Sequence, residues 1–167
     1  MAALRRNIGA SRLEVCRGTI EGLGAVSVSV PEGAPVVVEV TLSSYRGGIA
    51  ARGTASAPWV GECRRCGGGV ASEVAAVLHE RFTPEGATDQ DEDAYPMIGD
   101  EVDLEPMARD AVLLELPLAP LCSPDCRGLC PRCGTNWNST TCDCAPVGDP
   151  RWSVLDVLRE PGDSGLA

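Results

Sequence analysis

Cysteine spacing constrains this chain more than any other feature of its sequence. Six of the nine cysteines lie between positions 122 and 144. Within that stretch, Cys130-Pro-Arg-Cys133-Gly134 has the spacing of a zinc knuckle, in which two thiolates three positions apart hold one ion and a glycine permits a tight turn. Cys142-Asp-Cys144 follows eight residues later and supplies another pair. So many clustered thiols predict metal binding and are not needed for packing.

The composition predicts one strand-rich body beside this segment. At 167 residues, the chain is long enough for a single core with a small appendage. Aromatic residues make up 4%, so the core must be built from Val, Leu, Ile and Ala, which favours strands. No segment approaches the about 18 apolar residues of a membrane span, and no apolar stretch follows the N-terminal charges. We therefore expect a cytoplasmic protein with no membrane partner, whose reduced cysteines bind metal.

The formal charge of −10 argues against a nucleic-acid partner, because such partners usually select a basic surface. The distribution of the charge weakens this argument. Nine acids and no basic residue lie between Arg81 and Arg109, and removing nine negative charges from −10 leaves −1 for the remainder. The nine acids are Glu85, Asp89, Asp91, Glu92, Asp93, Asp100, Glu101, Asp103 and Glu105.

Alternating apolar residues predict consecutive antiparallel strands in a body that covers residues 20–117, after an N-terminal tail at 1–19. The alternation is clearest at Val26, Val28 and Val30, which should share one face of a strand. A tight turn is expected where Cys63-Arg-Arg-Cys66 precedes three glycines. The predicted strands cover residues 24–30, 35–42, 49–57 and 70–82.

A single longer helix is predicted near the end of the body, at 104–116. Asp103 suits its N-cap, Pro106 suits its first turn, and Pro117 should end it. Residues 84–99, which are acidic and poor in apolar residues, are expected to form a mobile loop before the helix.

The C-terminal part is predicted to be a Cys-rich zinc-binding lobe at 118–160, followed by a disordered tail at 161–167. The lobe should end in a short amphipathic helix that begins after Asp149-Pro150. The fold class expected is therefore α+β and strand-rich: an antiparallel sheet or a partly open barrel, with one central helix and a small Cys-rich lobe.

The cysteines other than Cys16 form four pairs, which suits two tetrahedral zinc sites. In the main alternative, a single site takes Cys122 or Cys126 in place of one of the last pair. Every such set is thiolate-only and leaves no open position for water, so the ion should be structural Zn²⁺. The primary set is Cys130, Cys133, Cys142 and Cys144, and the second is Cys63, Cys66, Cys122 and Cys126.

Catalysis finds little support in the sequence. Cys63-Arg-Arg-Cys66 has the spacing of a redox dithiol, and two arginines would lower a thiol pKa, yet such a pair normally opens a helix and here glycines and a strand follow. His79, the one histidine, lies in a predicted strand, and no phosphate loop, nucleophile elbow or paired-carboxylate motif is present. We therefore expect no enzyme, no catalytic residues and no small-molecule substrate.

Several segments together match the pattern of one known family. They are Cys63-Arg-Arg-Cys66, residues 103–117, residues 121–134, Asn136, Asn138, Cys142-Asp-Cys144 and Asp149-Pro-Arg151. This combination resembles the YceD family, whose enteric members are known as large ribosomal RNA subunit accumulation proteins. The resemblance implies a role in the accumulation or maturation of large-subunit ribosomal RNA (rRNA), with an rRNA precursor or a large-subunit ribosomal protein as the partner. It supplies no catalytic residues.

The zinc-fixed turns suggest how such a partner would be contacted. Guanidinium groups on rigid turns can bind RNA phosphates or a ribosomal protein, while Trp137 can either stack on a base or pack as a lid over the metal. Two other functions stay open, a zinc-ribbon nucleic-acid-binding or transcription accessory protein and a dithiol redox protein. The candidate contact arginines are Arg64, Arg65, Arg127 and Arg132.

Overall fold

The computed structural model describes residues 2–84, 93–145 and 150–158. The chain divides into two compact units, residues 1–122 and 123–167. The second unit contains one regular element, the 3-10 helix η1 (Pro150–Leu158), within its described part. The first unit contains α1 (Ala2–Arg5), β1 (Ser11–Gly18), β2 (Gly24–Ala25), β3 (Val28–Ser29), β4 (Val36–Tyr45), β5 (Gly48–Glu62), β6 (Gly69–Pro84), β7 (Tyr95–Met97) and α2 (Glu105–Glu115).

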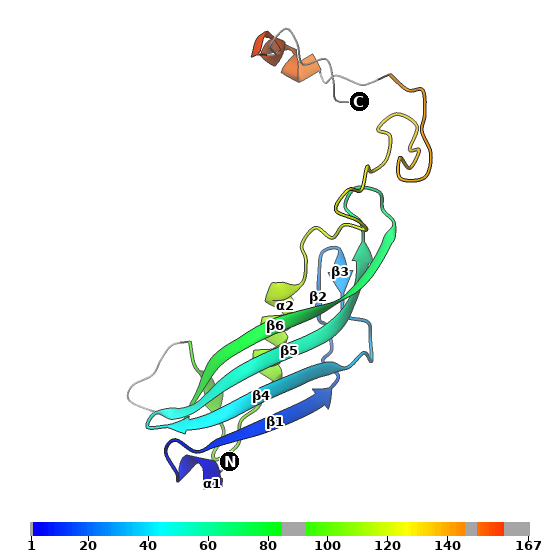
Figure 1. Cartoon of the computed structure of the whole chain (residues 1–167). Helices are drawn as coiled ribbons and strands as arrows, with labels where there is room; N and C mark the ends of the chain where they lie inside the picture. The colour runs from blue at the N-terminus through cyan, green and yellow to red at the C-terminus, as the bar shows by residue number, and fades with distance from the viewer. Residues whose placement is uncertain (1, 85–92, 146–149, 159–167) are drawn as a thin grey trace. The chain divides into compact units, whose positions relative to one another are not determined.

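Strand β5 organises the sheet (Figure 1). Along one side it pairs with β6 over its full length, from Ile49 opposite Phe82 to Glu62 opposite Gly69. Its other side is shared, because β4 occupies the first part and the short β3 occupies the last. β1 lies beyond β4, β2 lies beyond β3, and β7 adds a short parallel pairing to β6. The described strands thus form an open and almost entirely antiparallel sheet, as the sequence predicted.

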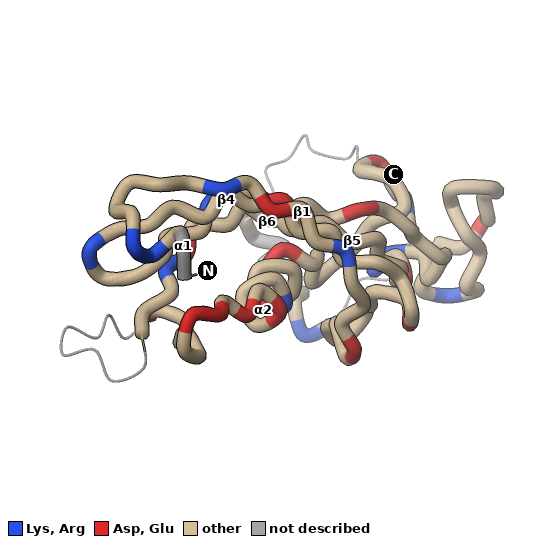
Figure 2. The backbone as a smooth tube through the Cα atoms, turned by 90° about the horizontal axis from the view of Figure 1, so that it is seen from below, with Lys and Arg blue, Asp and Glu red and all other residues tan. Residues whose placement is uncertain are grey.

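One face of the sheet is buried beneath α2, as Figures 1 and 2 show. The period-2 pattern of β4 directs Val36, Val38, Val40 and Leu42 to this face, and three alanines of β5 lie beside them: Ala51, Ala55 and Ala57. Helix α2 contributes Met107, Ala108 and Val112 to the same core. The largest fully buried side chains are Phe82, Leu42, Ile49, Leu78, Met97, Met107, Val36, Val40 and Val112.

The predicted helix is present and one residue shorter at each end than the sequence indicated. The N-cap is Leu104 and not the predicted Asp103, and no side chain caps the helix from that position. The carboxylate of Asp103, one residue earlier, accepts the backbone N–H of Glu105 at 3.0 Å. Leu116 is already extended, with φ −61° and ψ 131°, because the residue before a proline disfavours the helical conformation.

Three parts of the first unit differ from expectation. Residues 11–18, placed in the N-terminal tail, form β1, which is held by backbone pairing with β4. Val26 does not share a face with its neighbours, because it lies in the turn between β2 and β3 and is fully exposed. The predicted acidic loop at 84–99 ends in β7, where Met97 is buried. Residues 85–92 of that loop lie outside the described residues.

The described part of the second unit has cysteine-rich turns in place of an apolar core. Its buried side chains among the described residues are Cys126 and Cys130. The expected amphipathic helix is the 3-10 helix η1, whose apolar residues Val154, Leu155 and Leu158 are exposed. The predicted tail at 161–167 is outside the described residues. None of the described helices combines the length and apolarity needed to cross a bilayer.

Candidate metal centres

The turn between β5 and β6 is a knuckle built on Cys63 and Cys66. The N–H of Cys63 donates to the carbonyl of Gly68 at 2.8 Å, and the N–H of Gly67 donates back to the carbonyl of Cys63 at 2.8 Å. Gly67 has φ +67°, a left-handed conformation that side chains disfavour. These bonds curl the chain so that the two cysteines lie on one turn at the end of a long hairpin.

The segment from Cys130 to Thr135 repeats this geometry. The N–H of Cys130 donates to the carbonyl of Thr135 at 2.8 Å, and the N–H of Gly134 donates to the carbonyl of Cys130 at 2.9 Å. Gly134 has φ +73°. The sequence favoured the knuckle at Cys130 and Cys133, yet the glycine directly after the second cysteine marks both knuckles.

The eight clustered cysteines gather into two groups of four. Within each group, the sulfur atoms all lie within 4.8 Å of one another. A tetrahedral thiolate site with Zn–S bonds of about 2.3 Å separates its sulfurs by about 3.8 Å, and the sulfurs of Cys66 and Cys122 are 3.6 Å apart. Each group could therefore hold a metal ion. The first comprises Cys63, Cys66, Cys122 and Cys126, and the second comprises Cys130, Cys133, Cys142 and Cys144.

This grouping does not exchange Cys122 or Cys126 into the second set, which was the main alternative from the sequence. Cys122 is brought close to the first knuckle by the segment after α2, where the N–H of Arg64 donates to the carbonyl of Pro120 at 2.9 Å. Cys16 lies apart in β1 and belongs to neither group.

Side chains of the second unit donate hydrogen bonds to cysteine sulfurs. The indole N–H of Trp137 points to Cys142 Sγ at 3.4 Å, and the amide of Asn138 donates to Cys126 Sγ at 3.3 Å. The hydroxyl of Thr135 lies 3.0 Å from Cys133 Sγ. Donors of this kind orient thiolate ligands and stabilise their charge. The sequence indicated no role for the amide of Asn138 or the hydroxyl of Thr135, although both residues follow Cys133 closely.

Hydrogen bonds to the sulfurs shift the pKa values of the thiols. Backbone hydrogen bonds, first from Cys122 and then from Arg65 and Cys66, lower the pKa of Cys63 to about 6 against an opposing effect of desolvation. Hydrogen bonds from Thr135 lower the pKa of Cys133 to about 6.

Within the second group the two remaining shifts have opposite signs. The Trp137 indole lowers the pKa of Cys142. The pKa of Cys144 is raised to about 12, mainly by its hydrogen bond to Cys133. Crowded sulfurs thus share protons that a cation would displace.

The arrangement fits a structural ion and not a catalytic one. Four sulfur donors complete a tetrahedron, so neither group leaves a coordination position for water or substrate. Trp137 is half-buried and directs its N–H to a sulfur, which favours its reading as a lid over the metal.

The four candidate contact arginines lie on or beside the knuckle turns. Arg64 and Arg65 occupy the first knuckle and are exposed. Arg127 and Arg132 are exposed in the second unit, where the backbone N–H of Arg127 donates to Asn138 Oδ1 at 2.8 Å. The structure thus places these four cations at the surface of the cysteine-rich turns.

Comparison with known proteins identifies relatives. An uncharacterized protein of Mycobacterium tuberculosis is 40% identical over 148 residues, covering 86% of this chain and 72% of the relative. Two chloroplastic proteins are each named large ribosomal RNA subunit accumulation protein YCED homolog 1. The one from Zea mays is 42% identical over 53 residues (31% of this chain, 18% of the relative), and the one from Arabidopsis thaliana is 36% identical over 67 residues (40% and 21%).

No solved structure matches the chain significantly. A family model described as "Large ribosomal RNA subunit accumulation protein YceD" matches residues 51–159, a stretch that contains α2 and all eight clustered cysteines. The chain therefore belongs to the YceD family.

Proposed function

We propose that this chain is a non-enzymatic cytoplasmic factor that supports the accumulation and maturation of large-subunit rRNA, and that each four-cysteine group holds one structural Zn²⁺. Membership of a family described by large-subunit rRNA accumulation is the observation that carries the function. The names of the plant relatives agree with it.

Zinc is the ion that the donor sets fit best. Zn²⁺ accepts four thiolates in a tetrahedron without a preferred d-electron geometry. The second unit has little apolar burial to stabilise it, so ligation would supply much of its folding energy. Cys63 and Cys66 would fix the β5–β6 turn in the same way.

Direct contact with RNA is the mode of action that we favour. Arg64, Arg65, Arg127 and Arg132 are exposed on or next to turns whose backbone is closed by hydrogen bonds. Guanidinium groups on a stiff support lose little conformational entropy when they bind phosphates. A large-subunit ribosomal protein is the alternative partner.

Depletion and complementation test the proposal. Cells depleted of the protein should lose large-subunit rRNA and accumulate its precursors, measured by gradient sedimentation and RNA blots. The wild-type chain should restore the RNA, whereas a variant with alanine at the four contact arginines should not. In-cell crosslinking should recover large-subunit rRNA with the wild type only.

A matched control replaces other exposed arginines of the first unit. Alanine at Arg6, Arg17, Arg46 and Arg52 removes the same four positive charges away from the knuckles and should leave both complementation and crosslinking intact. Normal large-subunit rRNA in depleted cells would refute the function. Equal loss of crosslinking in both variants would refute the assignment of RNA contact to the knuckle arginines.

A further inference from the structure

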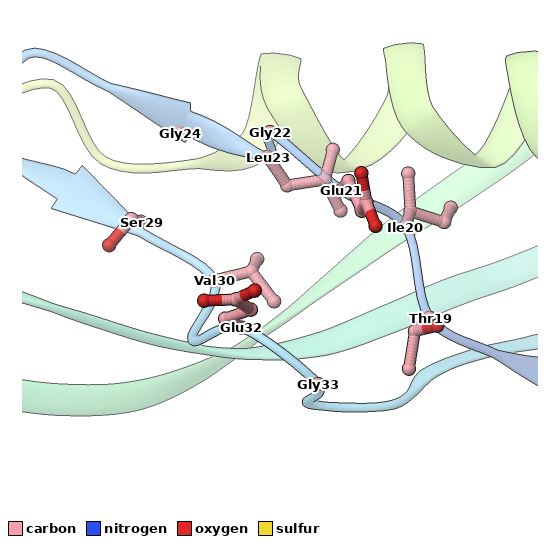
Figure 3. A pocket seen from close by; sticks show the side chains of 10 residues that line it. All are labelled: Thr19, Ile20, Glu21, Gly22, Leu23, Gly24, Ser29, Val30, Glu32 and Gly33. Atoms are coloured by element: carbon pink, nitrogen blue, oxygen red, sulfur yellow. The ribbon is translucent and has the colours of Figure 1, made fainter.

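A cavity of about 660 Å³ opens in the first unit, between the loop that leaves β1 and the loop that enters β4 (Figure 3). The two loops are joined at one end by the pairing of Gly18 with Val36 and at the other by the bond from Val30 N–H to the Leu23 carbonyl, at 2.9 Å. Between these closures, no backbone hydrogen bond joins the loops in the part of the chain that the structure describes. The pairing is therefore interrupted between these two closures, and the cavity lies where the two loops separate.

The lining combines apolar and acidic groups. The half-buried Ile20 provides accessible apolar surface above Leu23 and Val30, which are buried beneath it. Figure 3 shows Glu21 on the first loop and Glu32 on the second, and both glutamates are exposed. A ligand that fits this cavity has an aliphatic portion and a cationic end, which describes the side chains of arginine and lysine.

Both carboxylates are available to such a ligand. Among the described residues, neither Glu21 nor Glu32 forms an ion pair. Arg109 reaches the first loop, but its guanidinium donates to the backbone carbonyl of Glu21, at 2.7 Å, and to the carboxylate of Glu105, at 2.9 Å. The guanidinium of Arg109 is thus already hydrogen-bonded elsewhere. The carboxylates of Glu21 and Glu32 face the cavity and do not pair with this guanidinium.

Helix α2 reaches the first loop through Arg109 and is acidic in balance, with Glu105, Asp110 and Glu115 against that one arginine. Its acidic positions are red in Figure 2. The cavity volume is within the about 300–1,000 Å³ of ordinary binding pockets, so it admits more than one side chain. An isolated cation would gain little from exposed carboxylates, whereas a segment with several cations gains at each of them.

We propose that this cavity binds an extended basic segment of a partner protein, with an arginine or lysine stem against Ile20 and the cationic ends at Glu21 and Glu32. Proteins that bind RNA often carry such segments. The site uses none of the knuckle residues and goes beyond the proposed function, so either can fail while the other stands.

The test measures binding of a fluorescein-labelled 14-residue peptide of alternating arginine and alanine to the full zinc-loaded chain by fluorescence anisotropy. Replacing Glu21→Gln and Glu32→Gln together should weaken binding about tenfold, from two exposed charge pairs. The loss should shrink as salt rises from about 50 to 300 mM. Thr19→Trp, which fills the cavity without changing charge, should also weaken binding at least about fivefold. All three positions are exposed, and unchanged thermal melts will show that the variants fold.

The matched control is Glu39→Gln with Glu73→Gln, two exposed glutamates on the sheet face opposite α2 that change the net charge equally. Its affinity for the peptide should stay within about twofold of the wild type. Equal losses in the two double variants would show diffuse acidic attraction and overturn the site. So would unchanged binding in the cavity variants, no binding of the peptide, or tighter binding of an RNA 14-mer that depends on Glu21 and Glu32.

Discussion

Asn138→Ala should weaken metal binding at one of the two cysteine groups selectively, and the structure sets the size of the effect. The amide donates to Cys126 Sγ at 3.3 Å, and a hydrogen bond to a charged acceptor contributes about 1.5–3 kcal/mol. The residue is exposed, so the lower end applies. Asn138 also accepts the N–H of Arg127 at 2.8 Å, which adds some loss of loop order. We expect about 2 kcal/mol in total, or about 30-fold in zinc affinity.

The assay is competition with a chromophoric chelator, which reports zinc release as two phases if each group holds one ion. Asn138→Ala should shift one phase about 30-fold, whereas the neighbouring substitution Trp137→Phe should shift the other, because its indole N–H serves Cys142. Assignment comes from a background with Cys63→Ser and Cys66→Ser, in which only the second group remains intact. Asn138→Ala should then have almost no effect. An equal loss in that background, or no loss in the wild-type chain, would refute this reading of the hydrogen bonds.

Three further predictions concern the core, a knuckle turn and the thiols. Leu78→Ala should cost about 2–5 kcal/mol in urea unfolding, since Leu78 is fully buried, whereas Val77→Ala on the opposite face, where Val77 is 77% exposed, should cost less than about 0.5 kcal/mol. Gly67→Ala should lower the stability of the zinc-loaded protein by about 1 kcal/mol. The loss comes from backbone strain alone, because a Cβ at this position meets nothing within 4 Å. A change near zero in thermal melts would contradict the positive φ of Gly67. In chelator-treated protein at pH 7, Cys133 should be alkylated much faster than Cys144, because the pKa of Cys133 is lowered to about 6 and the pKa of Cys144 is raised to about 12. Mass spectrometry should show the alkylation rate of Cys133 falling as the pH drops through about 6. Equal rates for the two cysteines would count against the sulfur contacts.

Most of the sheet was predictable because its strands bury one face. The alternation along β4 reports burial directly, and the same pattern placed Leu78 and Phe82 inward. β1 was not predicted because it lies at the edge of the sheet, where Leu13 is 60% exposed and Val15 is 61% exposed. A strand without a buried face has no alternation of apolar and polar residues to reveal it.

Val26 shows a different limit of sequence reasoning. Gly24 pairs with Ser29 and Ala25 pairs with Val28, so the chain reverses at Val26. The alternation of apolar and polar residues nevertheless continues through this turn. Alternation cannot distinguish a continuous strand from a hairpin of two-residue strands. No neighbouring signal marks this turn except Ser27.

The cysteine pairs were readable from spacing, whereas their grouping was not fully so. Thiolate chemistry limits the sets to four ligands, but Cys66 and Cys122 are far apart in sequence, and their approach depends on the bond between Arg64 and Pro120. The cavity at Glu21 and Glu32 had no sequence signal, because it arises where two loops diverge between strand pairings.

The repeated knuckle has a consequence for how chains of this kind can vary. Each copy closes its backbone bonds within six residues, from Cys63 to Gly68 and from Cys130 to Thr135. Neither copy requires the other to shape its turn. Between their cysteines, the two copies have only arginine in common. The shape of each turn is therefore set locally, and a substitution in one knuckle leaves the backbone hydrogen bonds of the other in place.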